Sequence, residues 1–141
     1  MTIQPSPAAR LAGLTATGLL LTSPIATAAP NPDRPGTCYL YEGDRPVMRE
    51  TCTIGTGYGA GAHYAILNWS IGVITTLTMI NNCPAGDFDA AGFCEYTLDD
   101  YDAEPYARNA QLAITTTPDP NNVWCYRAIA TGNSVCYRFD D

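Results

Sequence analysis

Residues 64–80 read YAILNWSIGVITTLTMI, and this stretch decides the fold class of the chain. Its two halves, 64–69 and 73–80, are rich in Ile, Leu, Val and Thr, which favour pleated strands. Ser70-Ile71-Gly72 lies between the halves, and glycine readily adopts the positive φ that a tight turn needs. The stretch therefore predicts two strands joined by a short turn.

Short apolar runs of this kind recur on both sides of the stretch, separated by Gly, Pro and Asn. Further strands are expected at 39–41, 47–51, 114–117, 123–130 and 134–139. Glu42-Gly43-Asp44 and Gly132-Asn133 are expected to turn two further hairpins. Helical periodicity is weak, and the best candidate, 106–113, fits either a short helix or a strand. The pattern predicts a mostly β domain, a small disulfide-stapled antiparallel sandwich or barrel with at most one short helix.

The N-terminus has the order of a secretory signal peptide: a charge at Arg10, an apolar stretch at 11–21 and small residues after it. Ala26-Thr27-Ala28 fits a cleavage site before Ala29, so residues 1–28 are expected to be removed. The apolar stretch is shorter than the ~20 residues of a membrane-spanning helix. We therefore expect a secreted or periplasmic protein with no membrane insertion after signal removal.

All six cysteines follow this segment and form three close pairs in sequence. The pairs are Cys38 and Cys52, Cys83 and Cys94, and Cys125 and Cys136. In an exported chain such cysteines are typical of disulfides, and zinc would favour C-x-x-C spacings or paired histidines. The spacing leaves other pairings open, and we expect the sequential one. With a bend near Arg45, Cys38 and Cys52 would face each other. Residues 29–36 are expected to be a flexible lead-in, and 37–141 a single disulfide-bonded β domain.

The charge balance excludes several classes of partner. The chain has 14 acidic residues against seven arginines and no lysine, a formal net charge of −7. Such a domain is repelled by phosphate backbones, so we expect no nucleic-acid partner. The lack of lysine also excludes Schiff-base chemistry and a Walker-type phosphate site.

Half of the acidic residues lie between positions 87 and 104. They are Asp87, Asp89, Glu95, Asp99, Asp100, Asp102 and Glu104. Asp87, Asp89 and Glu95 match three positions of a calcium-binding loop, and calcium is the one cofactor considered. Ala91 and Leu98 stand where further ligands belong. A solvated acidic loop and the paired carboxylates of a glycoside hydrolase are the alternatives.

Other catalytic patterns are absent from the sequence. His63 is the only histidine, and no serine lies in a G-x-S-x-G elbow. Glycines alternate from Gly55 to Gly61, but a strand follows them where a dinucleotide site needs a helix. We expect a flexible loop or glycine-rich edge at these glycines, a surface or edge position for His63, and no enzymatic activity.

Aromatic residues are numerous for a small domain, with nine tyrosines and two tryptophans. Exposed aromatics form carbohydrate- or protein-binding faces, whereas buried ones anchor a core. Trp69 and Trp124 are expected in the core. The sequence thus predicts a secreted non-catalytic binding or structural domain of unknown ligand, whose partner is an unidentified protein or glycan. A weak calcium-binding extracellular module is one alternative.

A second alternative comes from a local resemblance. Ala60-Gly61-Ala62-His63-Tyr64, followed by Trp69-Ser70-Ile71-Gly72, resembles the S-G-x-x-Y and W-x-K-G stretches of the periplasmic c-type lysozyme inhibitors. The resemblance covers residues 60–72 and implies a small disulfide-bonded β-barrel that inhibits a lysozyme through an exposed loop at 57–64. The inhibitory serine of that family would fall on Ala60, and its lysine on Ile71. Both active groups are absent, so the resemblance supports a barrel more than inhibition.

Overall fold

The computed structural model of the protein describes residues 29–84 and 86–140, so the expected signal peptide lies outside the described residues. Every regular element in these residues is a β-strand, and all strand pairs are antiparallel, as predicted. The described part of the chain therefore has no helix that could cross a membrane. The strands are β1 (Ala29–Pro30), β2 (Arg34–Glu42), β3 (Arg45–Gly59), β4 (Ala62–Trp69), β5 (Ile74–Ile80), β6 (Glu95–Leu98), β7 (Tyr101–Arg108), β8 (Ile114–Thr115), β9 (Val123–Ala128) and β10 (Ser134–Phe139).

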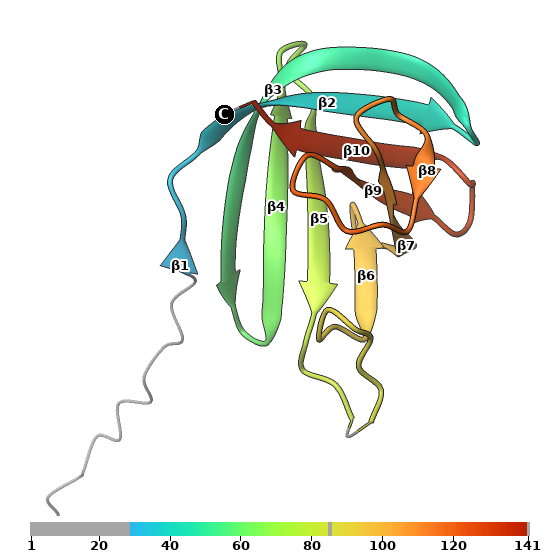
Figure 1. Ribbon diagram of the computed structural model, residues 1–141. Helices are drawn as coiled ribbons and strands as arrows, with labels where there is room; N and C mark the ends of the chain where they lie inside the picture. The colour runs from blue at the N-terminus through green and yellow to red at the C-terminus, as the bar shows by residue number, and fades with distance from the viewer. Residues whose placement is uncertain (1–28, 85, 141) are drawn as a thin grey trace, which may run out of the picture.

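The strands form one sheet that closes on itself. The order is β1-β3-β2-β10-β9-β7-β6-β5-β4, and β4 also pairs with β3, which joins the two ends. Figure 1 shows β4, β5 and β6 side by side in one layer, with β2 and β10 running across them. The long strand β3 curves from one layer into the other and so belongs to both. Of the two predicted architectures, the sheet adopts the barrel.

The hairpin of residues 64–80 is confirmed. β4 and β5 pair along their lengths, and the turn between them is closed by Trp69 N–H donating to Val73 O at 2.9 Å. Gly72 has a φ of 86°, the positive value that the turn requires. The final hairpin, β9–β10, is also confirmed, with Ser134 opposite Arg127 and Tyr137 opposite Trp124.

All three sequential disulfides are present: Cys38–Cys52, Cys83–Cys94 and Cys125–Cys136. Cys125 and Cys136 are direct cross-strand partners. The first bridge is confirmed as a pair, but its expected geometry is wrong. The turn is at Gly43-Asp44, and a register irregularity follows Leu40, so Cys38 lies opposite Glu50 and Cys52 lies opposite Gly36. The bridge therefore joins diagonal positions, with the two Cα atoms 5.9 Å apart.

The alternating glycines lie within a strand and not in a flexible loop. Gly55, Gly57 and Gly59 belong to β3, and only the tip of the following hairpin, Ala60-Gly61, leaves the strand. Gly57 is opposite Tyr64, whose ring covers the position that a Cβ would occupy. The missing side chain at Gly57 makes room for this tyrosine on a neighbouring strand.

The second half of the acidic stretch forms a hairpin that the sequence did not indicate. β6 and β7 pair around a turn at Asp99-Asp100, so the acids from Glu95 onward lie on strands or in a tight turn. The helix candidate at 106–113 is instead the end of β7 followed by a turn. At the other end of the domain, β1 pairs with β3 and β2 begins at Arg34, so the sheet starts before residue 37.

Two clusters of buried side chains stabilise the barrel. The larger cluster fills the interior with residues such as Leu67, Trp69 and Leu77. The smaller one lies on the opposite face of β2, β9 and β10 and includes Tyr41 and Val123. Figure 1 shows the segment 109–122, which carries β8, crossing β9 and β10 on this face. The positions of β9 thus alternate between the two clusters, and its first residues lie at the barrel's end.

Candidate binding site

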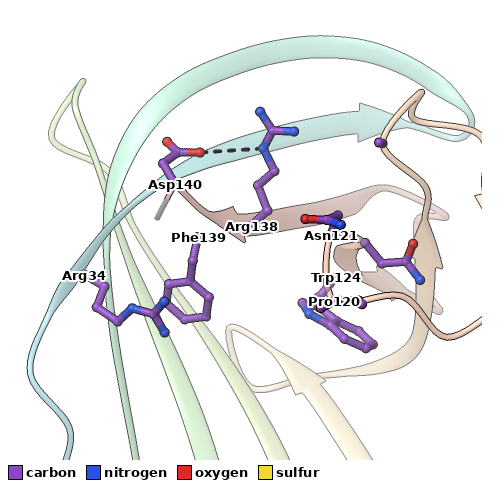
Figure 2. A pocket seen from close by; sticks show the side chains of 9 residues that line it. Arg34, Pro120, Asn121, Trp124, Arg138, Phe139 and Asp140 are labelled. Carbon is purple, nitrogen blue, oxygen red and sulfur yellow. Dashed lines mark ion pairs between the residues drawn. The ribbon is translucent and has the colours of Figure 1, made fainter.

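A large hollow lies where β10 ends and β9 begins. It has a volume of about 630 Å³ and is open to solvent. Its lining residues are Arg34, Ala110, Pro120, Asn121, Asn122, Trp124, Arg138, Phe139 and Asp140. Figure 2 shows Arg34 and Phe139 on one side, with Trp124, Pro120 and Asn121 on the other. The hollow thus combines two aromatic rings with several polar groups.

Trp124 is the most informative of these residues, and its expected place in the core is wrong. The two-residue period of β9 puts it on the same face as Tyr126, which is buried in the barrel interior. Trp124 is the second residue of its strand, however, and its side chain is 46% exposed. Trp69 is in the core as expected, 6% exposed, and its indole N–H donates to Thr75 Oγ1 at 3.0 Å.

Phe139 and Arg34 form the wall facing Trp124. The Arg34 guanidinium carbon is 4.0 Å from the centre of the Phe139 ring, a cation–π arrangement. Phe139 also meets Tyr137 edge-on, with the ring centres 5.9 Å apart. Because Tyr137 belongs to the buried core, this contact anchors the wall to the barrel interior.

An ion pair lies along a third side of the hollow. Arg138 Nε is 3.6 Å from Asp140 Oδ1, as the dashed line in Figure 2 shows. Thr37 Oγ1 lies 3.0 Å and 2.8 Å from the two carboxylate oxygens of Asp140 and donates to them. These contacts hold the carboxylate in place and keep a guanidinium beside it at the rim.

The turn at 119–122 positions the amide side chains. Asn121 N–H donates to Asp119 Oδ1 at 2.7 Å, and Asn122 N–H donates to Asp119 O at 3.1 Å. The buried side chain of Asn122 donates to Thr117 O at 2.9 Å. The aspartate thus organises the turn through its own side chain, as is common in Asx turns. Asn121 is left exposed at the edge of the hollow.

The hollow can therefore hold a ligand with an apolar face and polar edges. Trp124 and Phe139 offer aromatic faces, which pack against C–H groups. The guanidiniums donate hydrogen bonds, the carboxylate accepts them, and the amide of Asn121 does both.

The residues named for calcium are distributed differently from the expectation. Asp87 and Asp89 lie in the loop closed by Cys83–Cys94, whereas Glu95 begins β6. Among the described residues, no group of three or more His, Cys, Asp or Glu side chains is arranged to hold a metal ion. Calcium binding therefore stays a prediction, and the described residues show no arrangement of ligands that supports it.

Asp89 has a structural environment of its own. Its Oδ1 accepts hydrogen bonds from Ala91 N–H at 2.9 Å and Phe93 N–H at 3.0 Å, and Tyr96 Oη donates to its Oδ2. The Tyr96 hydrogen bond, followed by that of Phe93, lowers the pKa of Asp89. Burial, followed by the bond to Asp89, raises the pKa of Tyr96. The carboxylate organises the disulfide loop.

His63 lies on the outer part of β4 and is exposed. Its ring contacts those of Tyr58 and Phe93, with centre-to-centre distances of 5.8 Å and 5.3 Å. It is therefore one member of an aromatic row that continues from Phe93 to Tyr96. Of the two predicted positions, surface or edge, the exposed side chain agrees with the surface one, because β4 pairs with both β3 and β5.

The positions named by the inhibitor resemblance are far apart. Ala60 is at the tip of the β3–β4 hairpin, and Ile71 is in the β4–β5 turn. The whole of β4 lies between them, so one surface loop does not carry both. Residues 57–64 form a hairpin whose two strands pair along their length, and its exposed tip is a turn.

Sequence reasoning named one residue of the hollow, Trp124, and gave it the wrong environment. It missed Arg34, Phe139 and Asp140, because they lie at the two ends of the domain. The only available signal was the Pro118–Asn122 turn next to a tryptophan. Comparison of the chain with protein-family models, curated proteins and solved structures gave no significant match. Its function has to be inferred from its own residues.

Proposed function

We propose that the protein is a secreted, non-catalytic binding domain that holds a carbohydrate in the hollow at Trp124. The single observation that carries this proposal is the indole itself, 46% exposed beside a polar hollow of about 630 Å³. An exposed indole forgoes the favourable free energy that burial of its apolar surface in the core would give. A ligand that covers the ring would recover that free energy.

Carbohydrates match the chemistry of this hollow. A sugar ring presents C–H groups on one face, which pack on an indole, and hydroxyl groups around its edge. Arg138, Asp140 and Asn121 together supply donors and acceptors for those hydroxyls. The ion pair and the Asx turn hold these groups before a ligand arrives, which lowers the entropy cost of binding.

Three observations support the secreted and non-catalytic parts of the proposal. Three disulfides are typical of an oxidising compartment outside the cytosol. The only histidine, His63, lies in an aromatic row and does not line the hollow. Among the described residues that line the hollow, Asp140 is the only carboxylate, and it is paired with Arg138, whereas glycoside hydrolysis needs two carboxylates.

The test is a glycan array, followed by calorimetric titration of the glycans that bind. Trp124→Ala should weaken binding by about tenfold or more, because it removes the aromatic face. Phe88→Ala is the matched control, since Phe88 is similarly exposed in the disulfide loop and should bind like the wild type. Mass spectrometry should recover the glycan unchanged after long incubation.

Tryptophan fluorescence gives a second readout. The chain has two tryptophans, and Trp69 is buried, so quenching by acrylamide reports mainly on Trp124. A bound glycan should protect the fluorescence from quenching. The proposal is wrong if no glycan binds, or if Trp124→Ala binds glycans as tightly as the wild type. A cleaved glycan would contradict the non-catalytic part alone.

A further inference from the structure

A second surface, at the opposite end of the barrel, is apolar. Two neighbouring hollows of about 290 Å³ and 250 Å³ lie there, and both are lined by Leu40, Asp99 and Val135. The remaining residues of the groove include Met48, Trp69, Ile71, Val73, Leu98, Tyr101 and Ala128. We name this surface the apolar groove.

The edges of the apolar groove carry large apolar side chains that the barrel does not cover. Ile71 is 54% exposed in the β4–β5 turn, and Tyr101 is 70% exposed at the start of β7. Both lie beside a floor of partly buried or buried core residues such as Leu40 and Leu98. A turn can be built from polar residues, so exposed side chains of this size next to a groove indicate an interaction surface.

The charge at the groove is negative. Within the described part of the chain, Asp99 is the only charged residue that lines either hollow, and Asp100 follows it in the β6–β7 turn. Their φ values are 49° and 67°, in the left-handed region where Asn, Asp and Gly are the usual residues. The backbone therefore does not require a carboxylate at either position. Asp102 and Glu50 lie on the adjoining strands β7 and β3.

Thr76 N–H donates to Asp99 Oδ1 at 2.7 Å, which fixes one of the two carboxylates beside the groove. Asp100 forms no hydrogen bond or ion pair through its side chain with any described residue. A carboxylate without a protein partner beside an apolar groove is complementary to a cation that approaches together with an apolar group.

We propose that the apolar groove binds a cationic polypeptide segment, in which an apolar side chain is flanked by lysine or arginine. The apolar side chain occupies the groove between Leu40 and Val135, and the cations lie against Asp99 and Asp100. The net charge of the whole chain, −7, also favours the approach of a cationic partner. This surface is independent of the hollow at Trp124, so either proposal can fail alone.

Fluorescence anisotropy tests the proposal with three synthetic peptides that share a Leu-Ile centre. Lysines flank the centre in the first peptide, glutamines in the second and glutamates in the third. The lysine peptide should bind at least about tenfold more tightly than the glutamate peptide, and its affinity should fall as salt is raised. The glutamine peptide should lie between them.

Variants locate the binding surface. Ile71→Ser combined with Tyr101→Ser should weaken the lysine peptide by about tenfold or more, and Asp100→Asn should weaken it mainly at low salt. Ile114→Ser is the matched control: Ile114 is also exposed, but it lies on β8 opposite Arg108, at the other end of β7. Circular dichroism checks that every variant is folded.

Three results would overturn the proposal. Equal affinity for the lysine and glutamate peptides would show that charge has no role, and unchanged binding by the double variant would place the peptide elsewhere. A dimer in sedimentation that the double variant dissociates would show instead that the groove is a self-association surface.

Discussion

Arg108 is the charged side chain that the described residues enclose most completely. Its guanidinium carbon is 4.0 Å from the centre of the Tyr41 ring, and Nη1 donates to Leu112 O at 2.9 Å. Nη2 lies 3.3 Å from Asp44 Oδ1. One side chain therefore joins β2, the β2–β3 turn and the segment that carries β8. Burial raises the pKa of Tyr41, although the Arg108 cation acts in the opposite direction.

At the residue scale we predict that Arg108→Lys destabilises the protein by about 1–3 kcal/mol in urea unfolding. Lysine keeps the charge but loses the planar group that stacks on Tyr41 and donates in several directions. Arg45→Lys is the matched control, because Arg45 is an exposed partner of Glu42 and should change stability little. Equal stability of the two variants would contradict a structural role for the Arg108 guanidinium.

At the scale of elements, the β5–β6 connection depends on one carboxylate. Hydrogen bonds hold the pKa of Asp89 below its usual value of 3.8, so folding favours the charged form. The resulting stabilisation is complete above pH 3.8 and is lost as the pH falls through the lower pKa of the folded state. The loop should therefore loosen only in strong acid.

We predict that the amide resonances of Ala91 and Phe93 titrate together in NMR, with a midpoint below pH 3.8. Asp89→Asn should abolish this titration and lower the melting temperature at pH 7, with the difference narrowing toward pH 2. Asp87→Asn serves as the control within the same loop and should leave both readouts unchanged. A midpoint above 3.8 would contradict the role assigned to Asp89.

Millimolar calcium, added in the same melting experiment, tests the calcium prediction.

At the scale of the whole molecule, two disulfides that span the same number of residues have different positions in the barrel. Cys83–Cys94 and Cys125–Cys136 each join cysteines 11 positions apart. Each bridge therefore removes a similar conformational entropy from the unfolded chain, which corresponds to a stabilisation of about 3 kcal/mol. Cys125 and Cys136 are buried on adjacent strands, whereas Cys83 and Cys94 are half-buried in a loop.

We predict that replacing both Cys125 and Cys136 by alanine costs about 1–3 kcal/mol more than replacing both Cys83 and Cys94. The extra cost is the cavity left by two buried sulfur atoms. Urea unfolding of the two double variants measures the difference directly, since each is the control for the other. Equal losses would mean that chain entropy alone accounts for both bridges.

The sequence by itself determined the strand-rich class and the hairpins β4–β5 and β9–β10. It left the disulfide pairing open, and the structure confirms the expected sequential one. The strand-rich class and the hairpins depend on neighbours in the chain, through side-chain alternation, turn residues and short loops. The β6–β7 hairpin was not predicted, because acidic residues are poor strand formers and only the pairing with β5 and β9 compensates for them.

Only the tertiary structure decided which surfaces are open. Trp69 and Trp124 both lie near an end of a strand, but Trp69 is 6% exposed and packs in the core, whereas Trp124 is 46% exposed. Arg34 and Asp140, which are far apart in sequence, both line the hollow at Trp124. Leu40 and Tyr101 likewise both line the apolar groove. Such contacts depend on the register between strands that are distant in sequence, such as β2 and β10. Local sequence patterns do not encode this register.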